Sequence, residues 1–90
     1  MLERNGARLG ILFGSHARGT ADERSDVDLL IVDDRGGRYL DRLDRYFGDL
    51  WDALRAPVEL VVYTSAELER HRDSPFISRV LREGSTIYER

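Results

Sequence analysis

The lengths of the two connections between three short apolar runs constrain the fold of this chain most. The runs occupy residues 8–13, 27–32 and 58–63, and each has the length and composition of a β-strand. About a dozen residues join the first two runs, too few for a comfortable parallel crossover, so we expect these strands to be antiparallel. The connection at 33–57 is long enough to hold a crossover helix and to return the chain parallel to the second strand. The sequence therefore predicts an α/β (α+β) fold, a small mixed β-sheet flanked by helices.

The longest helix is predicted within the second connection, at residues 38–55. Apolar side chains recur there at helical spacing and define the face that should pack on the sheet. Charged side chains, Arg42 among them, are predicted to fill the opposite side. The apolar positions are Tyr39, Leu40, Leu43, Tyr46, Phe47, Leu50, Trp51 and Leu54.

Two shorter helices are predicted after the third strand. Thr64 and Glu67 have the spacing of a capping box, in which each side chain satisfies a free backbone donor of the other, so a helix should follow to about residue 72. Ser74 precedes a proline and should begin the next helix, with Gly84 where its C-terminal cap is expected. Residues 87–88 are predicted to be extended.

Three acidic residues are predicted to meet at one edge of this sheet. Asp26 and Asp28 are two positions apart at the start of the second strand, so their side chains should share a face. Glu59 opens the third strand, and the parallel return of the chain brings it to the same edge. An isolated Asp-x-Asp pair also occurs as a turn cap beside a solvated strand end, but the convergence of three acids favours a metal site. Hard oxygen ligands suit Mg²⁺, and we expect one or two ions there.

A turn of small residues after the first strand is predicted to hold phosphate groups. Gly14 allows close approach of a triphosphate to the backbone, and the Ser15 hydroxyl with the following amides can donate to phosphate oxygens. Arg18 can pair with a phosphate, with the carboxylates, or within the loop as a structural ion pair. Glu59 would bind a second metal ion or accept a hydroxyl proton as general base. The predicted catalytic and metal-binding residues are Asp26, Asp28 and Glu59, and the predicted nucleotide-binding residues are Gly14, Ser15 and Arg18.

Composition excludes several other functions. The 17 acidic and 14 basic residues give a net charge of -3, which argues against direct binding of nucleic acid. Cysteine is absent, so thiolate metal sites and cysteine nucleophiles are excluded. No apolar stretch has the length of a signal peptide core or of a membrane span. We expect residues 1–90 to form a single cytoplasmic domain with no membrane association.

These motifs resemble a known family. Residues 14–19, Gly-Ser-His-Ala-Arg-Gly, followed by residues 25–30, Ser-Asp-Val-Asp-Leu-Leu, are similar to the signature of the polymerase-beta-like nucleotidyltransferase superfamily. The short length, the strand around Glu59 and the tail at 76–88 resemble the minimal nucleotidyltransferase (MNT) group within it. The resemblance covers nearly the whole chain and implies a nucleotidyltransferase-like fold.

The resemblance also implies an activity and a partner. It implies Mg²⁺-dependent transfer of a nucleoside monophosphate, AMP from ATP or a counterpart from another nucleoside triphosphate, with Ser15 on the triphosphate and Asp26, Asp28 and the third-strand acid on Mg²⁺. Many of these sequences carry Asp where this chain has Glu59. Family members of this size commonly pair with a helical HEPN-domain toxin, act as its antitoxin and adenylylate one of its tyrosines.

Two alternatives remain open at the level of sequence. The chain could be a non-catalytic antitoxin that neutralises its partner sterically, or a nucleotidyltransferase for a small molecule. The second alternative needs an acceptor pocket that a chain this short cannot easily build. That pocket would come from a partner or a second copy of the chain, which predicts a homo- or hetero-oligomer.

Overall fold

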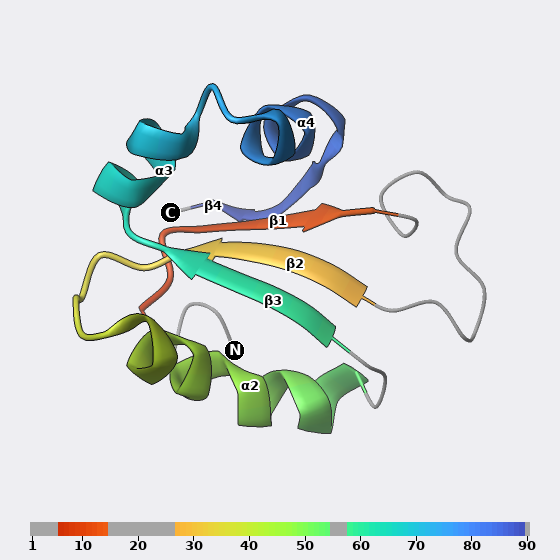
Figure 1. Ribbon diagram of the computed structural model, residues 1–90. Coiled ribbons are helices and arrows are strands. Elements are labelled where there is room, and N and C mark those ends of the chain that lie inside the picture. The colour runs from red at the N-terminus through yellow and green to blue at the C-terminus, as the bar shows by residue number, and fades with distance from the viewer. Residues whose placement is uncertain (1–5, 15–26, 55–57, 90) are drawn as a thin grey trace.

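The computed structural model describes residues 6–14, 27–54 and 58–89, which form a four-stranded sheet with helices on both faces (Figure 1). Helix α2 covers one face, and α3 and α4 cover the other (Figure 1). None of the helices in these residues is long and apolar enough to cross a membrane. The elements are the strands β1 (Leu9–Phe13), β2 (Val27–Val32), β3 (Val58–Tyr63) and β4 (Ser85–Glu89), and the helices α2 (Tyr39–Leu54), α3 (Ser65–His71) and α4 (Pro75–Glu83).

The strand order β3-β2-β1-β4 confirms the mixed sheet and the direction of its strands. Strand β1 pairs antiparallel with β2, whereas β2 pairs parallel with β3 across the connection that holds α2. The extended end of the chain adds a fourth strand, because β4 pairs antiparallel with β1. The register places Asp28 opposite Phe13 on one side and Glu59 on the other.

Alternation along β2 divides the core between the two faces of the sheet. Leu29 and Ile31 pack with Tyr46 and Leu50 of α2, while Leu30 packs against Ile11 and Val80 on the α4 face. Successive side chains of a strand point to opposite faces. Asp28 therefore shares the face of Leu30 and lies under α4, not under α2.

Helix α2 does not bury its apolar side chains as predicted. Tyr46 and Leu50 are buried, but Leu40, Phe47 and Trp51 are 70, 53 and 47% exposed. The prediction that α2 presents one apolar face to the sheet was therefore only partly correct.

Arg42 was predicted on the polar side of α2 and is buried instead. Its guanidinium donates to Glu67 Oε1 at 2.7 Å and to the carbonyl of Gly37 at 2.8 Å. Glu67 also accepts from the backbone N–H of Thr64, which donates in the predicted capping box. The ion pair and these hydrogen bonds offset the cost of burying a charge, so α2 can turn Arg42 inward.

Asp33, just after β2, is the second buried charge. Its carboxylate accepts from the Tyr46 hydroxyl at 2.7 Å and from the backbone and guanidinium of Arg35, and Arg45 lies at 3.4 Å. Burial alone would raise the pKa of Asp33, but the hydrogen bonds from Arg35 and Tyr46 together lower it. The network attaches the end of β2 to α2.

Helix α4 begins and ends as predicted, although Gly84 has an unexpected role there. The Ser74 side chain accepts from the N–H of Ile77 at the N-terminus, and Gly84 is the C-terminal cap. Gly84 has a φ of −71°, which other residues adopt readily. A Cβ at this position would overlap the Ile11 side chain and the Val80 carbonyl, so close packing of α4 on β1 explains the glycine.

Candidate active site

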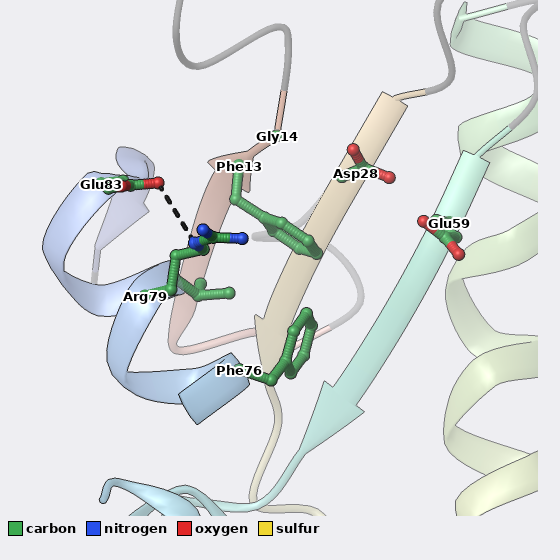
Figure 2. Close-up of a pocket in the computed structure, with 8 residues that line it drawn as sticks. Phe13, Gly14, Asp28, Glu59, Phe76, Arg79 and Glu83 are labelled. Carbon is green, nitrogen blue, oxygen red and sulfur yellow. Dashed lines mark ion pairs between the residues drawn. The ribbon is translucent and has the colours of Figure 1, made fainter. Parts of the chain in front are cut away.

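A cavity of about 170 Å³ opens on the α4 face of the sheet, where β1 ends and β2 and β3 begin (Figure 2). Its walls come from β1, β2, β3 and α4, so segments far apart in the sequence build it together. The lining residues are Phe13, Gly14, Asp28, Glu59, Phe76, Arg79, Val80 and Glu83.

Asp28 and Glu59 lie side by side in this cavity. They are register partners on adjacent parallel strands, and Figure 2 shows both carboxylates at the beginning of those strands. Neighbouring strands lie about 4.8 Å apart, so the two negative charges are held close to each other. The connection lengths predicted this meeting, and the structure places the two residues together.

Gly14 is required both for its backbone conformation and for its missing side chain. Its φ of +73° lies in the left-handed region, which residues with a Cβ adopt at a cost. A Cβ built on Gly14 would overlap the carboxylate of Asp28. The turn after β1 therefore brings bare backbone against the acidic pair, as close approach of a phosphate would need.

Three predicted site residues, Ser15, Arg18 and Asp26, lie outside the described residues. Among residues 6–14, 27–54 and 58–89, no group of three potential metal ligands occurs. The pair of Asp28 and Glu59 nevertheless fits a hard divalent cation, since two adjacent carboxylates supply the oxygen ligands that Mg²⁺ prefers. The metal-binding and catalytic roles of all three acids stay predictions.

Helix α4 adds residues that the sequence did not identify as part of the site. Phe76 packs edge-to-face on Phe13 with ring centroids 5.6 Å apart. Arg79 is three residues further along α4 and brings the only guanidinium among the described residues of the lining. It forms an ion pair at 3.8 Å with Glu83 of the same helix, and the Arg79 side chain is 70% exposed. Helical spacing indicates that Phe76 and Arg79 share a side of α4, but only the packing of α4 on β1 shows that this side closes the cavity.

The residues that build this site lie within a region that matches a known protein family. A model of the nucleotidyltransferase domain matches residues 2–84, which include every residue around the cavity. The chain belongs to the nucleotidyltransferase domain family. The predicted family is confirmed, and the acidic pair beside Gly14 lies within the matched domain. A search of curated proteins found no match.

Solved structures confirm the predicted fold class. One assigned as a minimal nucleotidyltransferase is 34% identical, with a TM-score of 0.67 over 93% of this chain and 79% of the other. A toxin-antitoxin crystal structure with AMP-PNP is 25% identical, with a TM-score of 0.70 over 99% of this chain and 68% of the other. A third comes from a complex of a tri-AMPylated Shewanella oneidensis HEPN toxin with an MNT antitoxin. At 22% identity and a TM-score of 0.61, over 99% of this chain and 64% of the other, it shows the fold alone.

Proposed function

We propose that residues 1–90 act as one minimal nucleotidyltransferase domain that transfers AMP from ATP onto a protein acceptor. The observation that carries the proposal is the register pairing of Asp28 with Glu59 beside the bare backbone of Gly14. Two carboxylates aligned on adjacent strands suit a divalent cation, and a metal-bound triphosphate supplies both the cation and the substrate. Membership of the nucleotidyltransferase family supports this assignment.

In the proposed reaction, an acceptor hydroxyl attacks the α-phosphorus of ATP. The new bond joins the hydroxyl oxygen to that phosphorus, the bond from the α-phosphorus to the bridging oxygen breaks, and pyrophosphate leaves. Glu59 is a candidate base for the hydroxyl proton, because it lines the cavity and is exposed at its edge. Asp26 and Asp28 would hold Mg²⁺, with Glu59 as a further ligand if it does not act as the base, and the ion would supply neutralisation of the charge on the phosphates.

The remaining site residues would position the triphosphate. Gly14 allows its close approach, and we assign phosphate contacts to Ser15 and Arg18. Arg79 is a further candidate, because it lines the cavity and its side chain is 70% exposed. A guanidinium matches the forked geometry of phosphate oxygens.

We further propose that the acceptor is a HEPN-domain toxin and that this chain is its antitoxin. The support comes from the solved neighbours, which include toxin-antitoxin pairs and a complex of a HEPN toxin with an MNT antitoxin. If the genome that encodes this chain carries no HEPN-domain gene beside it, this part of the proposal is wrong.

The test uses ATP labelled at its α-phosphate, Mg²⁺, the purified chain and the HEPN-domain protein encoded beside it. We expect label on the partner, no label when Mg²⁺ is chelated, and no label from a double Asp26→Asn and Asp28→Asn variant. Label that persists in the double variant would contradict nucleotidyl transfer at this site.

The exposed apolar side chains of α2 favour a second candidate function, a binding antitoxin that acts sterically. In that case the double variant would still protect cells that express the toxin. If only the parent rescues growth, protection depends on the transfer reaction instead.

A further inference from the structure

One side of helix α2 is apolar and is not used by the core. Leu40, Phe47 and Trp51 are separated by seven and four residues, so they lie on the same side of the helix. They are also among the most exposed large apolar residues of the described chain. Apolar side chains clustered on a surface in this way mark sites of protein interaction.

This side of α2 borders a groove of about 330 Å³ against strand β3. Strand β3 is the terminal strand on this side of the described sheet, so the groove follows an edge. Its apolar floor is flanked by two carboxylates, and none of the described residues that line it is basic. The lining residues are Leu40, Leu43, Asp44, Phe47, Val58, Glu59 and Leu60.

The groove and the active-site cavity share one residue. Glu59 lines both, because it lies on the edge strand between the α2 face and the α4 face of the sheet. Val58 and Leu60, its neighbours in sequence, point to the α2 side and form the wall of the groove. A protein segment seated in the groove would therefore pass directly beside Glu59, one member of the acidic pair.

We propose that the acceptor protein docks in this groove through apolar side chains flanked by Lys or Arg, and that docking delivers its reacting hydroxyl past Glu59. The apolar contacts would come from Leu40 and Phe47, and the basic residues would pair with Asp44. That the docked protein is the acceptor rests on the proposed function. The docking surface itself rests on its exposed apolar side chains, its acidic residues and its continuity with the cavity.

The test is a binding measurement without nucleotide, with the adjacent HEPN-domain protein as the probe. Asp44→Lys reverses the charge inside the groove, and Asp52→Lys is its matched control, an exposed acid of the same helix outside the groove lining. Leu40→Ser removes an apolar contact, and its control is Ile87→Ser, at an exposed apolar residue of β4 on the opposite edge of the sheet. Leu40 is 70% exposed, so its replacement should leave the fold intact.

We expect each groove variant to raise the Kd for the probe at least about tenfold, which corresponds to about 1.4 kcal/mol, and each control to stay within about twofold. Binding of Mg²⁺-ATP should be the same in all four variants. Groove variants that bind as tightly as their controls would overturn the proposal, as would a parent that does not bind the probe. Sedimentation adds a further outcome: a homodimer that dissociates in Leu40→Ser, with probe binding intact, would assign the groove to a second copy and overturn it as well.

Failure of docking and failure of transfer can be told apart. A parent that binds the probe through the groove and never labels it would retain the docking surface and contradict the proposed reaction. Groove variants that label the probe as well as the parent does would retain the reaction and contradict the docking surface.

Discussion

The two ends of strand β2 carry acidic residues in opposite settings. Asp33, after the C-terminal end, is fully buried and its charge is met by Tyr46, Arg35 and Arg45. Asp28, near the N-terminal end, is aligned in register with a second carboxylate, Glu59, in an open cavity. An acid surrounded by the chain's own donors stabilises the fold. Asp28 and Glu59, which meet in register at a cavity, form a pair that suits a bound cation, and we propose that Asp28 binds one.

The largest effect on stability should come from Asp33, at the C-terminal end of β2. Replacing Asp33 with Ala leaves the buried Tyr46 hydroxyl without its acceptor and two guanidiniums without their anion. We expect a loss of about 2–4 kcal/mol in the free energy of unfolding, measured by urea denaturation. Asp52→Ala on the exposed side of α2 should change it by less than about 0.5 kcal/mol. Equal losses for Asp33→Ala and Asp52→Ala would contradict a structural role of the buried Asp33 carboxylate.

Asp33 should also make the fold sensitive to acid. Its pKa is lowered in the folded protein from an ordinary value of 3.8, so the unfolded chain binds the proton more readily. The stabilisation is fully present above about pH 4–5 and is lost as pH falls below 3.8 through the folded value. Urea midpoints measured from pH 6 to pH 3 should therefore fall less steeply for Asp33→Asn than for the parent, and parallel curves would contradict this.

A substitution at Gly14 tests the role of the cavity at the N-terminal end of β2. Ala there adopts a left-handed backbone at a cost of about 1–2 kcal/mol and also displaces the Asp28 carboxylate. Gly36→Ala is a matched control, because Gly36 has a φ of +84° and open space where the Cβ would be. Both variants should lose stability through the backbone conformation, and Gly14→Ala should lose more because of the added overlap, but only Gly14→Ala should lose nucleotidyl transfer. Equal activity would show that close approach at Gly14 has no role in the reaction.

The smallest expected effect is on stability, at Gly48 in helix α2. Nothing lies within 4 Å of a Cβ added to Gly48, and glycine in a helix is less favourable than alanine. Gly48→Ala should therefore raise the free energy of unfolding by about 0.5–1 kcal/mol, seen as a higher thermal midpoint. Gly84→Ala should lower it, because its Cβ would meet Ile11 and Val80. A destabilised Gly48→Ala would reveal a contact that the fold does not account for.

Local patterns predicted most of the fold. The apolar runs predicted β2 and β3 with their observed bounds. The Thr64 capping box predicted the start of α3, and the connection lengths predicted the directions of the first three strands. Strand β4 was predicted only as an extended end, because its pairing partner, β1, lies more than seventy positions earlier in the chain. Nothing in the local sequence identifies such a partner.

Burial of charge could not be predicted in the same way. Arg42 and Asp33 are charged, and sequence rules place such residues on the surface. They are buried because Glu67, Tyr46 and Arg35 reach them from other elements or across a turn. Likewise, connection lengths predicted that Asp28 and Glu59 meet, but the contribution of Arg79 depends on how α4 packs, which no spacing encodes.

The most direct measurement compares labelling of the proposed HEPN-domain partner by Asp28→Asn and Asp33→Asn, each scaled to the amount of folded protein. Our account predicts that Asp28→Asn stays folded and labels at least about a hundredfold more slowly, a loss of about 2.7 kcal/mol in transition-state stabilisation. It predicts that Asp33→Asn unfolds at lower urea and labels at the parental rate below its transition. Parental labelling by a folded Asp28→Asn would contradict the central claim that the acid at the start of β2 takes part in the chemistry.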